Sequence, residues 1–323
     1  MKKLARLLFA AAICLLWAGS TYSEIRISGR LSGEWPPPDV QRPDTGYVVY
    51  VIDGPSWIPA GSSLIIHGKV KIQILWPPAI IVFGRMVTRA SQDSPIFIEA
   101  VSNAEGFRFE GAAATPDTLR HIQVSQDKFP RNALTSNGRA LYVQNCELWA
   151  SWAAICAYSA CVEIRDCGIY KRGGGEAAIY LVGADGSLII QNRIDVQFPD
   201  MLPDFPSTNG IYINTIQDGE ISNNTIDIRG PGFTTGIFGE SICHSLSIEN
   251  NSIYCQSENL VPRGIGLKHA VYCAISACTV TVDSRSPAQA VLWLYGSTVA
   301  EVMNSSLSLG GAGFGELVHQ EGG

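Results

Sequence analysis

The sequence predicts an all-β fold, a single-stranded right-handed parallel β-helix of about ten coils, from two recurring patterns and the placement of its insertions. The first pattern is an Ile or Val, two residues, then Asn, Cys or Ser, one residue, and an aliphatic residue. Its copies are 21 to 32 residues apart, which is typical of stacked structural units. The fourth residues of the seven copies are Cys146, Cys167, Asn192, Asn224, Asn251, Cys278 and Ser305.

The residue before each of these positions predicts a bend between two short strands. Asn and Asp tolerate a left-handed backbone conformation better than other non-glycine residues, and most of these positions are Asn or Asp. A bend here turns the Asn/Cys column inward, where stacked amides can hydrogen-bond along the axis. The predicted bend residues are Asn145, Asp166, Gln191, Asn223, Asn250, Ala277 and Asn304.

The second pattern is a small residue followed by Ile or Val, about 13 residues before each copy of the first. Each unit therefore carries at least two strands and a bend, and a single coil could not bury its apolar face alone. An antiparallel sandwich or barrel with coincidental spacing is the alternative, and seven aligned copies disfavour it. The markers begin at Ala154, Ala178, Gly210, Gly236, Gly264 and Ala290.

Composition limits the class of partner. The chain has 323 residues, of which 46% are hydrophobic and 16% are charged, and its net charge is −6. It can bury a large core, but it lacks the basic surface that nucleic-acid binding requires. We expect that the protein is a monomer and that it has no nucleic-acid partner.

The predicted domain organisation begins with a signal peptide at residues 1–23. Lys2, Lys3 and Arg6 precede an apolar run, 7–17, that is too short to span a membrane, and cleavage is expected before Glu24. We expect a secreted, periplasmic or cell-surface protein without a membrane span. Residues 24–46 are Pro-rich and predicted to be irregular or a cap, 47–310 form the β-helix, and 311–323 form a flexible tail.

Eight cysteines remain after such cleavage, and an even number in an exported chain permits disulfides. Cys146, Cys167 and Cys278, however, replace Asn in the inward column, which favours buried thiols that act as small apolar residues. The pairing stays open. No Cys-x-x-Cys pair or suitably placed His indicates a metal site.

The first half of the helix resembles a known group of proteins. Residues 57–66 (WIPAGSSLII) resemble the Pro-Ala-Gly, then Leu-x-Ile opening of many secreted bacterial β-helix proteins. Residues 82–86 (VFGRM), 94–98 (SPIFI) and 106–109 (GFRF) resemble the steps that follow it. The chain thus resembles the pectin-lyase-like superfamily over roughly residues 47–310. The resemblance implies the fold, but many chemistries share this scaffold.

Alternation away from the inward Ile of the second marker predicts two outward columns beside the longest insertions, 197–208, 229–235 and 256–263. Aromatic rings along one solvent face and walled by loops form a groove suited to sugar rings. The alternative is that these rings only cover the sheet under their own loops. The predicted substrate-binding residues are Tyr180, Tyr212, Asn214 and Phe238.

A further outward column contains Asp195 and Asp227 on neighbouring coils. Carboxylates that close can share a proton or bind Ca²⁺. Two oxygens are few for calcium and no third acid is in register, so we expect a solvated face and no cofactor or metal.

The paired aspartates, Gly-His-Gly and Arg-x-Lys steps of related enzymes are absent, so no catalytic residue is carried over. Glu240 and Lys268 lie in one outward column, with Arg263, His269 and His244 nearby in the sequence. A lyase needs a base beside a uronate carboxylate and a cation that holds this carboxylate. Lys268 or His269 is the predicted base and Arg263 the clamp.

Two hypotheses follow. The first is an exported β-helix protein that binds a polysaccharide along the groove and cleaves it as a polysaccharide lyase or glycoside hydrolase. The second is a non-catalytic cell-surface or scaffold protein whose rod shape is its function. A cluster of acid, base and cation in the groove would favour the enzyme, and a groove filled by its own loops would favour the scaffold.

Overall fold

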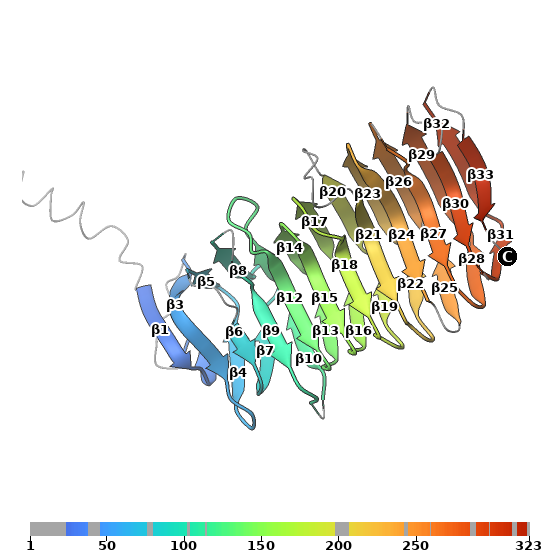
Figure 1. Cartoon of the computed structure of the whole chain (residues 1–323). Coiled ribbons are helices and arrows are strands. Elements are labelled where there is room, and N and C mark those ends of the chain that lie inside the picture. The colour runs from blue at the N-terminus through green and yellow to red at the C-terminus, as the bar shows by residue number, and fades with distance from the viewer. Residues whose placement is uncertain are drawn as a thin grey trace, which may run out of the picture.

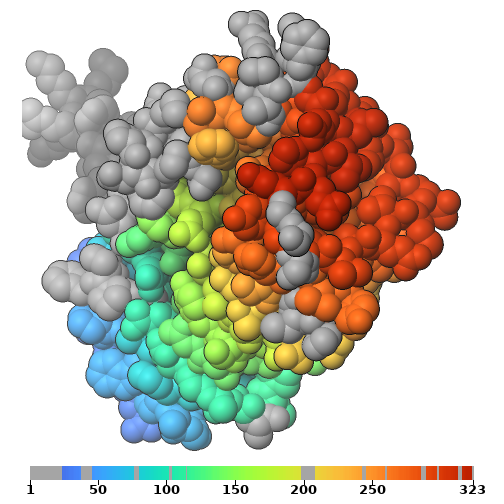
Figure 2. All heavy atoms as spheres, turned by 45° about the vertical axis from the view of Figure 1, so that its right-hand side comes forward, coloured from blue at the N-terminus to red at the C-terminus, as the bar shows by residue number. Residues whose placement is uncertain are grey.

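The computed structural model describes residues 24–37, 46–75, 80–101, 104–113, 115–197, 207–241, 245–258, 260–284, 289–296, 298–311 and 315–321. Within these ranges the regular structure consists of β-strands, which stack as successive coils along one axis (Figure 1). Strands of neighbouring coils pair in parallel. Figure 2 shows the coils as adjacent bands that follow the chain from one end of the molecule to the other. The prediction of a parallel β-helix of about ten coils is confirmed.

Each coil contributes one strand to each of three sheets that run along the rod. The first sheet comprises β6 (Ile80–Val82), β9 (Phe107–Glu110), β12 (Asn132–Asn137), β15 (Ala153–Tyr158), β18 (Ala177–Val182), β21 (Ser207–Asn214), β24 (Phe233–Glu240), β27 (Arg263–Lys268), β30 (Gln289–Tyr295) and β33 (Gly315–Glu321). The second comprises β2 (Gly33–Trp35), β4 (Ser63–His67), β7 (Arg85–Arg89), β10 (Asp117–Arg120), β13 (Leu141–Gln144), β16 (Val162–Arg165), β19 (Leu188–Ile190), β22 (Glu220–Ser222), β25 (Leu246–Glu249), β28 (Cys273–Ser276) and β31 (Ala300–Met303).

The third sheet comprises β5 (Val70–Ile74), β8 (Ile96–Ala100), β11 (Ile122–Val124), β14 (Glu147–Ala150), β17 (Gly168–Arg172), β20 (Arg193–Gln197), β23 (Thr225–Gly230), β26 (Ser252–Ser257), β29 (Thr279–Ser284) and β32 (Ser306–Gly310). β3 (Val48–Ile58) joins the first and third sheets, because its first half pairs with β5 and its end with β6. β1 (Glu24–Arg30) pairs along β3. The inward aliphatic side chains of all three sheets form one continuous core.

The bend between the second and third sheets has the predicted conformation. All seven predicted bend residues have a left-handed backbone with φ of 50–58°. The following column points inward and is buried at Asn192, Asn224 and Asn251. Asn192 Nδ2 donates to Asn224 Oδ1 at 3.0 Å, and Asn224 Nδ2 donates to Asn251 Oδ1 at 3.0 Å. The predicted amide ladder is therefore present.

The cysteines of this column are buried thiols, as the sequence favoured. Cys146, Cys167 and Cys278 are each at most 3% exposed and unbridged. Cys156, Cys161, Cys255 and Cys273 are also free thiols, whereas Cys243 lies outside the described residues. A thiol fits the column because it is small and weakly polar.

Both ends of the rod contain more regular structure than the sequence predicts. Residues 24–46, predicted to be irregular or a cap, include β1 and β2, and Trp35 stacks on Tyr50 with ring centroids 4.5 Å apart. Residues 311–323 include β33, which pairs with β30 instead of forming a flexible tail. Pro and Gly content misled the prediction, because pairing with a neighbouring coil supplies order that local propensity does not. Residues 1–23 lie outside the described ones.

The marker in the last full coil is shifted by one residue from the predicted alignment. Leu292, not Val291, pairs with the inward Ile265, so Trp293 is the outward residue opposite Gly266. The other coils have Gly or Ala before the inward aliphatic residue, and here Val291 takes that place. The alignment based on a small residue at the marker was therefore wrong at this coil.

A buried ion pair lies in the first half of the rod, and no sequence pattern predicts it. Arg139 is 2% exposed and donates to the fully buried Asp117. The Arg139 guanidinium also donates to the carbonyls of Val82, at 3.2 Å, and Gly84. Burial raises the pKa of Asp117 despite this partner. One cation therefore satisfies backbone groups from a distant coil.

A search of the described residues for membrane-spanning segments finds no helix with the necessary length and hydropathy. Among the same residues, no group of three or more His, Cys, Asp or Glu side chains could hold a metal ion.

Candidate functional site

Aromatic side chains form a row along the outer face of the first sheet, where the sequence predicted a groove. Cys156, Tyr180, Tyr212, Phe238, Gly266 and Trp293 are register partners on successive coils. The Tyr180 and Tyr212 rings stack with centroids 4.8 Å apart, and Tyr212 and Phe238 are 5.8 Å apart. One strand spacing is about 4.8 Å, so the parallel coils bring these rings into contact.

Gly266 interrupts the row, and the Phe238 ring lies over the position that a side chain of this residue would occupy. A Cβ at this position would lie 2.9 Å from Phe238 Cδ2, which is closer than real Cβ atoms approach. Phe238 and Trp293 instead face each other across the glycine, with centroids 6.3 Å apart. Trp293 also stacks on Tyr295 at 5.4 Å. The row therefore continues into the last coils, beyond the residues that the sequence predicted.

Arg263 lies at the start of β27 beside this row. Its guanidinium is 3.9 Å from the centroid of the Trp293 ring, within cation–π range. Burial lowers the pKa of Arg263, but a guanidinium remains charged near neutral pH. Its Nε is buried and has no hydrogen-bond partner among the described residues. A buried N–H of a cation without an acceptor favours an anionic ligand group at this position.

Two hollows meet at Arg263. One, of about 450 Å³, is lined by Tyr212 and Phe238 together with Glu176, Asn209, Phe233, Thr235 and Arg263. The other, of about 370 Å³, lies on the far side of Arg263 and is lined mainly by Trp293, His319 and the acidic residues Glu316 and Glu321. Both volumes lie within the usual range for small-ligand sites. The two hollows and the aromatic row together are called the Arg263 groove below.

A polar network lies at the other end of these strands and shares Tyr212 with the aromatic row. Lys268 Nζ contacts Glu240 Oε1 at 2.5 Å, Tyr212 Oη donates to Glu240 Oε2 at 3.1 Å, and Asn214 Nδ2 donates to Tyr212 Oη at 3.1 Å. The hydrogen bond from Lys268 lowers the pKa of Glu240, and the same contact raises the pKa of Lys268. Burial raises the pKa of Tyr212 to about 12. Near neutral pH the network therefore contains a carboxylate, an ammonium group and a phenol.

The structure brings together some of the predicted site residues and separates others. Tyr180, Tyr212 and Phe238 form the row. Glu240 pairs with Lys268, but Arg263 is five residues from Lys268 along β27, or roughly 16 Å for an extended strand.

His269 is exposed, has φ of 50° at the end of β27, and packs its ring against Tyr295 at 5.6 Å. The predicted base and the predicted clamp therefore stand at opposite ends of β27. His244 and most of the 197–208 insertion lie outside the described residues.

The sequence missed two groups of residues in the groove. Trp293 and Tyr295 were hidden by the shifted marker, although the alternation Trp293-Leu294-Tyr295 is typical of a strand with two outward rings. Asn209 and Thr235 stand directly before the marker glycines and are register partners of each other and of Arg263, so the position before the marker could have identified them. Glu176 lies one residue earlier in its coil and has no such signal.

The two aspartates of the third sheet are register partners, as predicted. Asp195 accepts from Arg172 at 3.0 Å, and Asp227 accepts from Nε and Nη2 of Arg229 at 2.9 and 2.8 Å. Each carboxylate therefore has its own cationic partner, which disfavours a shared calcium ion.

Comparison with known proteins gives the class of protein. The model of the family described as "Right handed beta helix region" matches residues 131–307, more than half of the chain. The chain belongs to this family of right-handed β-helix proteins. No curated protein matches the sequence.

Two solved structures have a similar fold. One is a variant of the periplasmic alginate epimerase AlgG, with 11% identity, coverage of 91% of this chain and 85% of that chain, and a TM-score of 0.46. The other is an alginate lyase from Paenibacillus sp. str. FPU-7, with 11% identity, coverage of 79% and 93%, and a TM-score of 0.34. Similarities of this size carry no argument about the activity of this chain.

Proposed function

We propose that the protein is an exported binder of an anionic polysaccharide, which it holds in the Arg263 groove. The observation that carries this proposal is the Arg263 guanidinium, which lies 3.9 Å from the Trp293 ring with its buried Nε unpaired among the described residues. A sugar carboxylate or sulfate could accept this hydrogen bond while the sugar ring lies against an aromatic face.

The aromatic row supports a chain-like ligand rather than a single sugar. Tyr180, Tyr212, Phe238 and Trp293 extend over five coils, counting the coil of Gly266. Five coils span four strand spacings, or roughly 19 Å. Burial raises the pKa values of Tyr180 and Tyr212, so both side chains are uncharged near neutral pH and present their ring faces to a sugar ring.

The ion pair with Glu240 disfavours Lys268 as the base of a lyase. A general base must be deprotonated, but Glu240 stabilises the charged form of Lys268. The catalytic roles of Glu240, Lys268 and His269 remain a hypothesis that a turnover assay would test. The cell-surface scaffold remains the alternative if no glycan binds.

The test is calorimetric titration with polygalacturonate and with the same polymer after reduction of its carboxyl groups. We expect binding of the uronate form only, weakened about 10- to 100-fold in Arg263→Gln because a charged hydrogen bond is lost. Arg263→Lys should restore part of the affinity, since it keeps the charge but not the planar fork.

Arg229→Gln is the matched control, because Arg229 lies on the third sheet and pairs with Asp227. Equal binding of both polymers, or an unchanged affinity in Arg263→Gln, would overturn the proposal. Absorbance of unsaturated products, followed in the same samples, distinguishes a lyase from a binding protein.

A further inference from the structure

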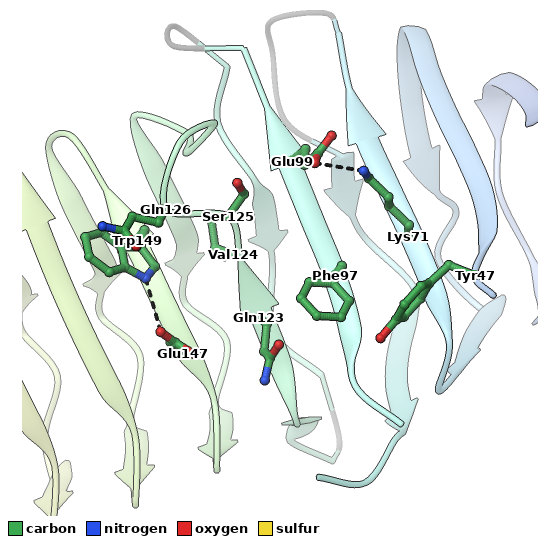
Figure 3. Close-up of a pocket in the computed structure, with 10 residues that line it drawn as sticks. All are labelled: Tyr47, Lys71, Phe97, Glu99, Gln123, Val124, Ser125, Gln126, Glu147 and Trp149. Carbon is green, nitrogen blue, oxygen red and sulfur yellow. Dashed lines mark hydrogen bonds and ion pairs between the residues drawn. The ribbon is translucent and has the colours of Figure 1, made fainter. Parts of the chain in front are cut away.

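A second hollow lies on the outer face of the third sheet, away from the Arg263 groove. It has a volume of about 450 Å³ and opens across β5, β8, β11 and β14 (Figure 3). Its lining residues include Lys71, Phe97, Glu99, Gln123, Glu147 and Trp149.

The short strand β11 creates this hollow. Phe97, Gln123 and Glu147 are register partners on three successive coils. β11 ends at Val124, and the next residue is the small Ser125, which also lines the hollow. Phe97 and Glu147 are two strand spacings apart, roughly 9.6 Å, with the floor between them formed by the middle coil. Figure 3 shows Gln123 between the Phe97 side and the Glu147 side.

Aromatic side chains form both walls. The Tyr47 ring packs edge-on against Phe97 with centroids 4.9 Å apart and an interplanar angle of 86°, which fixes the orientation of Phe97. On the opposite side, Trp149 stacks on Tyr170 at 4.3 Å. Both walls are thus held by contacts within the protein, Phe97 by Tyr47 and Trp149 by Tyr170, and a ligand need not order them.

The polar groups of the hollow are mostly acceptors and amides. Lys71 pairs with Glu99 at 2.8 Å, and Gln73 donates to the other Glu99 oxygen at 3.0 Å. Burial acts to raise the pKa of Glu99, but the hydrogen bonds from Lys71 and Gln73 outweigh it and lower the pKa.

Glu147 accepts from Trp149 Nε1 at 3.4 Å through one oxygen. Its second oxygen and the amides of Gln123 and Gln126 make no hydrogen bond to other described residues.

From this arrangement we propose that the hollow is a second saccharide site, which binds a neutral sugar residue. Lys71 and Lys128 lie 2.8 and 4.0 Å from Glu99 and balance its charge, whereas Glu147 has no ion pair among the described residues and would repel an anionic group at its side of the opening. Sugar hydroxyls can donate to Glu147 and the amide oxygens, while the apolar face of the ring packs on Phe97. This site differs in face and in charge preference from the Arg263 groove and does not depend on it.

The test is calorimetric titration of the protein with neutral hexasaccharides, namely cellohexaose, maltohexaose, mannohexaose and xylohexaose. We expect at least one to bind, with a change in tryptophan fluorescence because Trp149 borders the site. Phe97→Ala and, separately, Gln123→Ala should each weaken binding at least tenfold. Gln123 is a surface polar residue without a protein hydrogen bond, so its replacement should leave the unfolding midpoint unchanged.

Gln144→Ala is the matched control, since Gln144 is a partly buried glutamine at the end of β13 on the second sheet. Full affinity in Gln144→Ala and in Arg263→Gln would support a separate site. The proposal is overturned if none of the four hexasaccharides binds, if Phe97→Ala and Gln123→Ala both retain full affinity, or if binding is lost in Arg263→Gln alone.

Discussion

Replacing Asn224 with Ala tests the role of the amide ladder in stability. Asn224 Nδ2 donates to Ile189 O at 2.8 Å and to Asn251 Oδ1 at 3.0 Å. Its Oδ1 accepts from the backbone N–H of Asn192 at 2.9 Å and from Asn192 Nδ2 at 3.0 Å. The side chain therefore satisfies one backbone carbonyl and one backbone amide inside the rod.

The expected cost follows from these partners. Asn192 Nδ2 keeps a bond to Ile164 O, and Asn251 Oδ1 keeps the N–H of Asn224. Ile189 O and the N–H of Asn192 lose the partners described above. A buried backbone group without a partner costs about 1–3 kcal/mol, so Asn224→Ala should lower the free energy of unfolding by about 2–6 kcal/mol.

Asn224→Ser is the matched control. Ser305 occupies the same column three coils further on, and its hydroxyl accepts from the backbone N–H of Cys278 at 3.2 Å. A serine at position 224 should likewise accept from Asn192 and recover part of the loss. Urea unfolding followed by circular dichroism measures all three proteins. An unchanged midpoint in Asn224→Ala, or a lower midpoint for the serine than for the alanine variant, would refute this reasoning.

Two further predictions concern the bends and the polar network. Ala277 has φ of 52°, a left-handed conformation that costs a non-glycine residue about 1–2 kcal/mol. Asn tolerates this conformation better than Ala, so Ala277→Asn should raise the unfolding midpoint. A lower midpoint would contradict the assignment of strain. Glu240 has a lowered pKa, so its ion pair contributes stability that is lost as pH falls through a pKa below the usual 4.5. Lys268 has a raised pKa, so its contribution is lost as pH rises through a pKa above the usual 10.5. In Lys268→Met, the urea midpoint should therefore change less with pH at both the acidic and the basic extreme, measured from about pH 3 to about pH 11. A pH dependence identical to that of the unmodified protein would count against the ion pair.

The bends and the inward column could be predicted because they depend on local chemistry that recurs in every coil. Asn145, Asn223 and Asn250 tolerate positive φ, and the next residue must then face inward to continue the stack. The aromatic row followed from the same register. Seven copies of one signal compensated for the weakness of each, and even Ala277 adopts the bend although its side chain does not favour it.

The rest could not be predicted, because it depends on contacts between segments without a repeat. Arg139 reaches carbonyls more than fifty residues earlier in the chain, and no spacing rule indicates this contact. The shared column predicts that Glu240 and Lys268 are register partners, but it does not predict that their side chains turn toward each other to form an ion pair. In the last coil, one Val in place of Gly or Ala was enough to shift the alignment and hide Trp293.

The amide ladder and the aromatic row occupy the same coils. Asn192, Asn224 and Asn251 belong to the coils that carry Tyr180, Tyr212 and Phe238, whereas thiols or a hydroxyl replace the amide toward both ends. Each asparagine side chain accepts a hydrogen bond from one adjacent coil and donates one to the other, so the coils in the middle of the rod are the most rigidly connected. A rigid backing holds the three rings at fixed spacing before a ligand arrives, which lowers the entropy lost on capture.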